Sequence, residues 1–332
     1  FAPRSLAFLA PLLLAVLFGL WHNATPRRAA WRGFLFGVGM FGTGVTWIYI
    51  SIHDYGGVGT ALTAFITALF VVVLSLFPAA AGGMARRLAA NRPPGAALLL
   101  VFPAAWLLGE WVRGWFLTGF PWLNLGYSQI DTPLRGLGPV TGVYGISLAV
   151  AFTAGLIVHA VRGRSLPVLT LSAAAAAVLW LGGWALDGIK WTAPAGRPLK
   201  VSLIQGNIPQ DIKWLPEMRD PTIDLYERLS ARHWDSDLIL WPETAVPAFY
   251  QEVADRLDTF AASARRHGAD VLLGVIALDG DMHHYYNAVL QMGDHTSFYY
   301  KHHLVPFTEY LPMQAALGGL IQFMDVPMSS FS

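Results

Sequence analysis

The chain has 332 residues, of which 55% are hydrophobic and only 13% are charged, and its formal net charge is +1. This charge content is about half that of ordinary globular domains, which indicates a membrane protein. The near-neutral balance and the lack of a basic stripe argue against a nucleic-acid partner. The absence of cysteine excludes disulfides and cysteine-ligated metals within the chain.

The first half of the chain is dominated by apolar stretches of membrane-spanning length, which is about 20 helical residues. There are six such stretches: residues 6–21, 33–52, 58–84, 95–117, 137–161 and 166–186. The first is the shortest and contains Pro11, and a cleaved signal peptide would account for that stretch at most. The run lengths disfavour the alternative of buried helices in a soluble core. We therefore predict a transmembrane helical domain of about six spans over residues 1–187.

Arginines concentrate in alternate connections between these stretches. The arginine-rich connections carry Arg27, Arg28, Arg32, Arg86, Arg87, Arg92, Arg162 and Arg164. The opposite connections offer only Arg4, Arg135 and Lys190 near the ends of the apolar stretches. Because cytoplasmic loops carry the excess of Lys and Arg, the first set is predicted to be cytoplasmic. Everything after residue 187 is then expected on the outer face.

Two polar features interrupt the membrane half. Glu110 and Arg113 are three residues apart, so they are expected to pair on one helix face, with Arg113 reaching toward the interface. The following sequence Thr-Gly-Phe-Pro-Trp contains Phe120 and Trp122. Such aromatic density is typical of an interfacial belt, and the alternative is that these rings line the mouth of a lipid site.

From residue 199 the pattern changes to alternating β and α segments. Strands are predicted at 199–205, 237–241, 271–278, 285–292 and 296–300, and the last two read as a hairpin or adjacent strands. Two helical faces lie between the first three strands, one marked by Ile223, Tyr226 and Leu229, the other by Val253, Leu257, Phe260, Ala261 and Ala264. Gly268 is expected to end the second helix. The alternation predicts an α/β layered sheet over residues 188–332.

The sequence contains little that would indicate a metal-binding or phosphate-binding site. The histidines occur as the adjacent pairs His283-His284 and His302-His303, and neighbouring side chains on a strand point to opposite faces. Zinc ligation is therefore disfavoured. The sequence has no glycine-rich phosphate loop either.

Two ionisable residues follow predicted strands and are flanked by bulky aromatic residues. Glu243 lies in Leu-Trp-Pro-Glu-Thr-Ala, and Lys301 in Tyr-Tyr-Lys-His-His-Leu-Val-Pro-Phe-Thr-Glu-Tyr. Strand ends in layered α/β sheets are where crevices form, and burial there would raise a carboxyl pKa and give a usable general base. Glu309 is placed to turn back and pair with Lys301. Taken singly, each residue is more often structural than catalytic.

Together these segments resemble the carbon–nitrogen hydrolase (nitrilase) superfamily, whose triad is Glu–Lys–Cys. The combination with preceding membrane spans and Thr-Gly-Phe-Pro-Trp is narrower, and is similar to the apolipoprotein N-acyltransferase family over nearly the whole chain. The resemblance implies that Glu243 is the general base, Lys301 the oxyanion-stabilising cation and Glu309 a supporting glutamate. It also implies a functional role for Trp214; the alternative is that this residue walls a core.

The chain departs from the family in having no cysteine. Ser329, Ser330 and Ser332 are poor substitutes, because they lie in a stretch that the family shares upstream of its cysteine. We therefore expect the nucleophile outside this chain. Residues 188–332 would then be the N-terminal part of an incomplete nitrilase-like sandwich, and the start at Phe1 also suggests a piece of a longer protein.

The resemblance further implies acyl transfer from a phospholipid, such as phosphatidylethanolamine, to diacylglyceryl-cysteine of an apolipoprotein, through a thioester and without a cofactor. The catalytic domain would face the periplasm from the bacterial inner membrane. Two alternatives remain open at this point. A membrane-tethered amidase would hydrolyse the thioester and should have an open, polar pocket mouth, whereas a non-catalytic membrane scaffold would lack a nucleophile in its downstream sequence.

Overall fold

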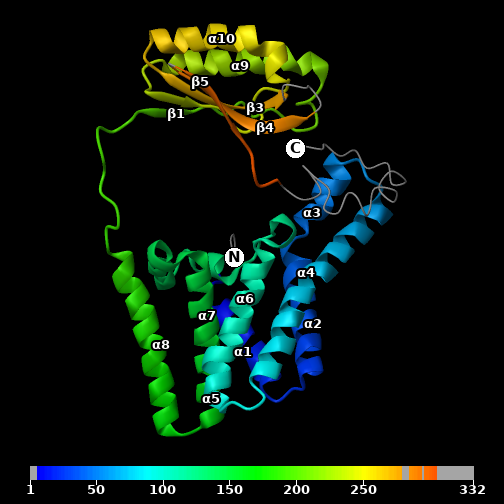
Figure 1. Ribbon diagram of the computed structural model, residues 1–332, viewed down its shortest axis with the longest axis vertical. Coiled ribbons are helices and arrows are strands. Elements are labelled where there is room, and N and C mark those ends of the chain that lie inside the picture. The colour runs from blue at the N-terminus through cyan, green and yellow to red at the C-terminus, as the bar shows by residue number, and fades with distance from the viewer. Residues whose placement is uncertain (1–5, 279–283, 294, 305–332) are drawn as a thin grey trace. The chain divides into compact units, whose positions relative to one another are not determined.

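The computed structural model describes residues 6–278, 284–293 and 295–304. The chain divides into two compact units, Phe1–Ala193 and Pro194–Ser332 (Figure 1). The first unit is helical and the second contains a sheet with helices, so each is described by itself.

The helical unit is built from long apolar helices joined by short turns. Its α-helices are α1 (Leu9–His22), α2 (Pro26–Gly44), α3 (Trp47–Ile50), α4 (Thr60–Leu88), α5 (Pro94–Ala96), α6 (Phe102–Arg113), α7 (Gly138–Gly163) and α8 (Leu166–Asp187). Single π-helical turns, η1 (Ser51–Tyr55) and η2 (Ala97–Val101), continue α3 and α5. Short 3₁₀ segments, η3 (Phe116–Thr118), η4 (Leu125–Gln129) and η5 (Pro133–Leu137), follow α6.

Fewer segments are long and apolar enough to cross a membrane than the sequence predicts. Within the described residues, four qualify: Thr60–Leu88, Pro94–Arg113, Pro133–Gly163 and Leu166–Asp187. Pro26–Gly44 and Trp47–Tyr55 qualify only together, and they are bent by 52°. The first helix has 14 residues, which is about 21 Å and short of a bilayer core of about 30 Å. A multi-pass helical domain is confirmed, and the part of the chain that is described holds four or five segments of spanning length beside the short apolar helix α1.

Helix α2 begins earlier than its apolar stretch. Thr25 has an extended backbone, its hydroxyl accepts a hydrogen bond from the Arg28 N–H at 3.3 Å, and Pro26 occupies the first helical turn. This is a favourable start because the cap satisfies an unpaired N–H and proline has none to satisfy. The predicted cytoplasmic connection therefore holds Arg27 and Arg28 in a helix rather than a loop.

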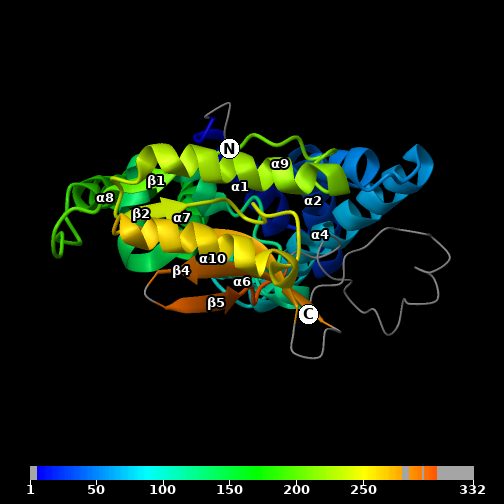
Figure 2. The same cartoon turned by 90° about the horizontal axis from the view of Figure 1, so that it is seen from above.

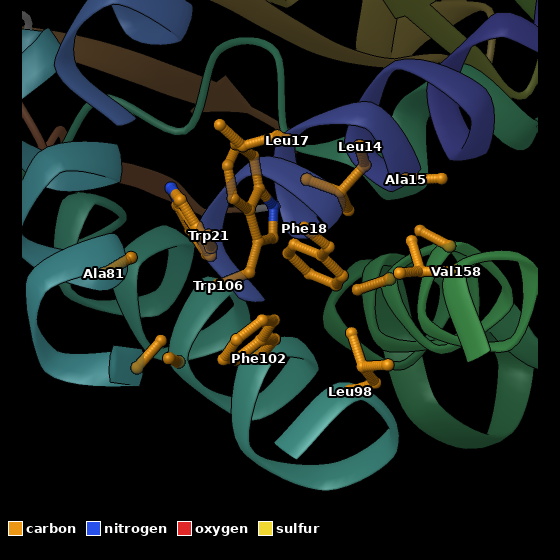
Figure 3. Close-up of a cluster of buried hydrophobic side chains, with 14 of the residues drawn as sticks. Leu14, Ala15, Leu17, Phe18, Trp21, Ala81, Leu98, Phe102, Trp106 and Val158 are labelled. Carbon is orange, nitrogen blue, oxygen red and sulfur yellow. The ribbon is translucent and has the colours of Figure 1, made fainter. Parts of the chain in front are cut away.

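Aromatic rings fill the core of the helical unit (Figure 3). Phe18, Trp21 and Phe102 are fully buried, with ring centroids 5.4–5.8 Å apart. Leu98 and Trp106 pack around them from the helical stretch that contains α6. Because rings and close-packed aliphatic groups have few low-energy alternatives, this cluster fixes how α1 and α6 lie against each other.

Small residues let α2 and α4 approach closely. A Cβ on Gly33 would lie 2.2 Å from the carbonyl oxygen of Pro78, and one on Gly37 would lie 2.7 Å from the Pro78 ring. Such close backbone approach is the usual basis of helix packing in membranes. Larger side chains at either glycine would push the two helices apart.

The second unit is a five-stranded mixed sheet with two helices on one face (Figures 1 and 2). Its strands are β1 (Val201–Leu203), β2 (Leu238–Leu240), β3 (Asp270–Leu278), β4 (Tyr285–Met292) and β5 (Thr296–Tyr300). The order is β1-β2-β3-β4-β5, with the first two pairings parallel and the last two antiparallel. The α/β layered sheet is thus confirmed.

Helices α9 (Arg219–Ser230) and α10 (Tyr250–Arg266) lie side by side over this sheet. Arg256 of α10 forms ion pairs with Asp224 and Glu227 of α9. The apolar face predicted for α10 is buried against the sheet core: Val253, Leu257, Phe260, Ala261 and Ala264. The helix ends as predicted, with Gly268 at φ +74° directly after the terminal turn.

The opposite face of the sheet is apolar and exposed. Its exposed side chains include Val201, Leu203, Val289 and Tyr299. Strand alternation sends the residues of the other face, such as Ile239 of β2 and Leu290 of β4, into the core beneath the helices. A sheet with both faces apolar is built to be covered on both sides.

Candidate active site

The turn after β2 is anchored to the helical layer by a buried tryptophan. The Trp241 indole N–H donates a hydrogen bond of 2.8 Å to the Ser230 hydroxyl, and its ring stacks on Tyr226 at 5.1 Å. Phe260 of α10 packs on the same ring at 5.0 Å. Glu243, two residues after Trp241, therefore starts from a fixed backbone rather than a mobile loop.

The same turn presses against β3 at a glycine. The Val246 N–H donates to the Gly274 carbonyl at 3.3 Å, and a Cβ on Gly274 would lie 2.4 Å from the Thr244 nitrogen and 2.6 Å from Glu243 Cα. Thr244 itself has φ +46°, a left-handed conformation that costs a β-branched residue free energy. Only glycine at position 274 leaves room for this backbone.

Two polar side chains, from β4 and from the residue after β5, meet at Glu243. Lys301, directly after β5, donates from Nζ to Glu243 Oε1 at 3.0 Å. The Asn287 side chain of β4 donates from Nδ2 to the same oxygen. The Asn287 backbone carbonyl accepts the Lys301 backbone N–H at 2.9 Å. The structure thus brings together the two residues that the sequence singled out, across 58 positions of chain.

Asn287 is the residue that sequence reasoning missed. It is buried and stands between tyrosines and apolar residues in β4. A buried amide must be hydrogen-bonded, so an asparagine in an apolar strand is itself a signal of a polar partner across the sheet. Its partner is the Glu243 carboxylate.

A pocket of about 400 Å³ opens at this cluster. Glu243, Asn287 and Lys301 supply its polar groups. The remaining lining is mainly apolar: Leu240, Trp241, Leu272, Gly274, Ala288, Val289 and Tyr299. Its size and composition suit a small or elongated apolar group beside a reacting polar centre.

The electrostatics of Glu243 differ from the sequence expectation. Burial acts to raise the pKa of this carboxyl, but the hydrogen bonds from Lys301 and Asn287 and the charges of Lys301 and Lys213 outweigh it and hold the pKa below its ordinary value. The side chain is also 63% exposed rather than buried. The predicted upward shift is therefore wrong, because the neighbouring cation and amide dominate over desolvation.

This balance gives a titration test. We expect the Glu243 carboxyl to titrate below 4.5, its ordinary value. Lys301→Met should raise that pKa, because the ionised form loses its hydrogen-bonded cation while burial still opposes charge. Infrared difference spectra against a Glu243→Gln variant isolate this carboxylate band. Lys200→Met, which removes an exposed lysine paired with Asp235, is the control and should leave the band unmoved. A wild-type midpoint above 4.5 would contradict the assignment.

Lys213 and Trp214 adjoin the same turn. The Lys213 ammonium group donates to the Thr244 hydroxyl at 2.8 Å and lies 5.5 Å from the centre of the Trp214 ring. Burial lowers the pKa of Lys213, while the charge of Glu243 acts in the opposite direction. Trp214 is 48% exposed, so the alternative that it walls a core is wrong. Lys213 was not singled out from sequence.

Three further residues, Phe120, Trp122 and Glu309, were predicted for the site. Phe120 and Trp122 belong to the helical unit, where their rings stack at 4.8 Å, and Trp47 lies 5.6 Å from Trp122. Glu309 lies outside the described residues. Within the part of the chain that is described, no group of three potential metal ligands comes together.

A helical unit with several membrane-spanning segments, joined in one chain to an α/β unit with a carboxylate–ammonium pocket, defines a multi-pass membrane protein with a site-bearing sheet domain. The sequence model of the apolipoprotein N-acyltransferase N-terminal domain matches residues 1–156. Taken with the relatives described next, this shows that the chain belongs to the apolipoprotein N-acyltransferase family.

Relatives of that name match from end to end of this chain. The protein from Coxiella burnetii is 38% identical over 100% of this chain and 68% of its own length. Those from Methylococcus capsulatus and Pseudomonas putida are 47% and 43% identical, each over 100% of this chain and 66% of their own length. The chain therefore spans about two thirds of the length of these relatives.

Proposed function

We propose that the full-length protein transfers an acyl chain from a phospholipid to the α-amine of diacylglyceryl-cysteine on apolipoproteins, through a thioester on a cysteine outside this chain. The observation that carries the proposal is the meeting of Lys301 and Asn287 at Glu243 in a pocket with apolar walls. Family membership supports it over a non-catalytic scaffold. The apolar lining favours lipid chemistry over a hydrolase with an open, polar site.

In the first step, Glu243 takes the thiol proton and the thiolate attacks an ester carbonyl of the phospholipid. Lys301 stabilises the oxyanion of the tetrahedral intermediate, a contribution of about 2.7–4 kcal/mol for one such donor. The C–O bond then breaks, and the leaving alkoxide takes the proton from Glu243. The products are a lysophospholipid and an acyl-enzyme thioester, with the carboxylate regenerated.

In the second step, the α-amine of the acceptor attacks the thioester carbonyl. Glu243 accepts the amine proton and passes it to the departing thiolate as the C–S bond breaks. The amide product dissociates, and the enzyme is returned to its starting state with a free thiol and an ionised Glu243. A covalent intermediate suits two lipid substrates, because they need not be bound together.

The shared oxygen of Glu243 offers a way to adjust its basicity during the reaction. At rest, the Lys301 hydrogen bond lowers the carboxyl pKa, which makes Glu243 a weak base toward a thiol of ordinary pKa about 8.5. When Lys301 turns toward the developing oxyanion, that stabilisation is withdrawn while partial burial remains. The carboxylate then becomes a stronger base for the thiol proton.

The other predicted residues have supporting roles in this scheme. Glu309 would orient Lys301, and Trp214 would lie beside the turn that carries Glu243. Phe120 and Trp122 would contact the lipid, and phosphatidylethanolamine is the proposed acyl donor. No cofactor is required, because both steps are acyl transfers without redox change.

The proposed function is tested with phosphatidylethanolamine carrying a labelled acyl chain and a synthetic diacylglyceryl-cysteine peptide. The full-length protein should convert them into a labelled amide and lysophospholipid in equal amounts, as followed by mass spectrometry. Omitting the peptide should leave the label on the enzyme as a hydroxylamine-sensitive thioester. Steady release of free labelled fatty acid, without amide, would instead identify a hydrolase.

We also propose that the sheet unit lies in the periplasm, on the outer face of the bacterial inner membrane, as the arginine distribution indicates. Single cysteines introduced at Ala90 and Ala195, both exposed, are unique in a chain that has none. A membrane-impermeant thiol reagent applied to intact cells should label Ala195→Cys and not Ala90→Cys until the cells are opened. The reverse pattern would invert the orientation.

A further inference from the structure

Two charges at the end of α6 are almost completely buried. Glu110 and Arg113 are each only 3% exposed. They do not form the predicted pair: among the described residues no ion pair joins them. A buried charge in a membrane-spanning helix is costly unless it is bonded, and such charges commonly serve function.

Both charged side chains form hydrogen bonds with the loop at residues 119–125, which follows α6. The Arg113 guanidinium donates from Nη1 to the carbonyls of Phe120 and Trp122 and from Nη2 to Asn124 Oδ1. The Arg113 carbonyl also accepts the Phe120 N–H at 2.8 Å. The planar fork of arginine can hold several acceptors at once, so one side chain fixes three points of the loop.

Glu110 holds the far end of the same loop. Its Oε1 accepts the Leu125 N–H at 2.9 Å and the Trp106 indole N–H at 3.0 Å. The cation therefore binds three acceptors spaced along the loop, and the anion binds the backbone N–H of the residue that ends it. The loop thus supplies hydrogen-bond partners to both charges, although Glu110 Oε2 is buried without one among the described residues, and the two charges define the path of the loop.

The backbone of this loop needs such support. Leu123 has φ +61° and Gly119 has φ +88°, and a left-handed leucine costs about 1–3 kcal/mol unless its surroundings impose it. A Cβ on Gly44 would lie 2.3 Å from the Leu123 side chain, which shows how tightly the loop meets the end of α2. The conformation is held by its contacts rather than by local preference.

What the loop presents is an aromatic surface. The rings of Phe120 and Trp122 are stacked with planes 15° apart, Phe70 meets Phe120 edge-on at 5.0 Å, and Trp47 lies near Trp122. Trp122 is 46% exposed and Trp47 is 40% exposed. Rings exposed at the end of membrane-spanning helices lie at the depth of lipid ester groups.

We propose that Glu110 and Arg113 are positioning residues that clamp the 119–125 loop and so hold Phe120 and Trp122 in place for the phospholipid substrate. The lipid part of this inference rests on the proposed function. The clamp itself does not, because it follows from the bonds within the helical unit. If the loop were freed, the rings would be present but mobile. Ordering them on binding would then cost conformational entropy and weaken the affinity for the lipid.

The clamp is tested first without catalysis. A spin label on Trp122→Cys of this chain is unique, because the chain has no cysteine. Its spectrum should be immobile with Arg113 present, mobile in Arg113→Met and intermediate in Arg113→Lys, which keeps the charge but loses the fork. Glu110→Gln should loosen the loop less than Arg113→Met. Arg135→Met is the matched control, since Arg135 is exposed and pairs with Asp187 rather than with the loop.

The second measurement uses the full-length protein with phosphatidylethanolamine. In Arg113→Met the KM for phospholipid should rise about tenfold, the cost of ordering one or two aromatic side chains, while the maximal rate of thioester formation changes less. An immobile label in Arg113→Met overturns the clamp, and a mobile label with unchanged KM overturns its role in lipid binding. Failure of the wild-type protein to form thioester would sink the proposed function, whereas the label would still decide the clamp.

Discussion

Glu243→Gln in the full-length protein should reduce thioester formation from phospholipid by about 10²–10⁴-fold, the usual contribution of a positioned general base. The glutamine keeps the size of the side chain and can still accept the hydrogen bond from Lys301. It cannot take the thiol proton. Intact-mass spectra after a single turnover measure the acylated fraction directly.

Lys301→Met should cost thioester formation about 10²–10³-fold, as expected for loss of one oxyanion donor. The apolar stem is kept, so the contacts that line the pocket change little. Glu252→Gln and Lys200→Met are matched controls, because both residues are exposed on the same unit and lie outside the pocket lining. Both controls should retain normal rates.

The contrast between the two substitutions distinguishes their roles. Glu243→Gln should remove the acid limb of the pH–rate profile, whereas Lys301→Met should move that limb to higher pH, because the Glu243 carboxyl loses the cation that lowers its pKa. A near-normal acylation rate in either variant would show that the residue does not have the role assigned to it here.

The elements that the sequence predicted well are those governed by local periodicity. The bounds of β4 and β5 match the predicted 285–292 and 296–300, because two runs rich in aromatic and β-branched residues are separated by a Gly-Asp turn. The buried face of α10 follows from the 3.6-residue spacing of Val253, Leu257 and Phe260.

The break after α2 has a tertiary cause that the sequence does not display. Apolar residues continue from α2 into Trp47–Tyr55, so composition alone predicts one continuous span over 33–52. The bend lies where Gly44 meets Leu123, a residue from a loop nearly eighty positions later. A hydropathy profile shows how long and how apolar a segment is. It carries no information on tertiary contacts such as that between Gly44 and Leu123.

The site could be predicted only in part for a similar reason. Glu243 and Lys301 were found by their places after strands, but their environment depends on Asn287, which reaches them through antiparallel pairing of β4 with β3 and β5. A reader of the sequence who does not know that pairing would expect burial to raise the pKa of Glu243. In the structure the pKa is instead lowered. The charged and hydrogen-bonding neighbours of Glu243 depend on the register in which the strands pair, and that register cannot be read from the sequence.

Among the described glycines of the sheet unit, Gly274 should tolerate an added methyl group poorly. A Cβ there would lie 2.4 Å from the Thr244 nitrogen and 2.5 Å from the Pro242 carbonyl oxygen, both backbone atoms that cannot rotate away. Gly274→Ala should therefore destabilise the unit by about 1–3 kcal/mol, the usual cost of overpacking. It should also displace the turn that carries Glu243, and a shift of about 1 Å at a catalytic group can cost about 10²-fold in rate.

Stability and activity must be measured separately for this variant, because unfolding alone would also abolish acyl transfer. Ala264→Val is the matched control: Ala264 is fully buried on the core-facing side of α10 and outside the pocket lining. Both variants should lower the thermal midpoint, but below that midpoint only Gly274→Ala should lose thioester formation. Equal activity in the two folded variants would show that the site tolerates movement of the turn, and Glu243 would then not be the group whose placement limits the reaction.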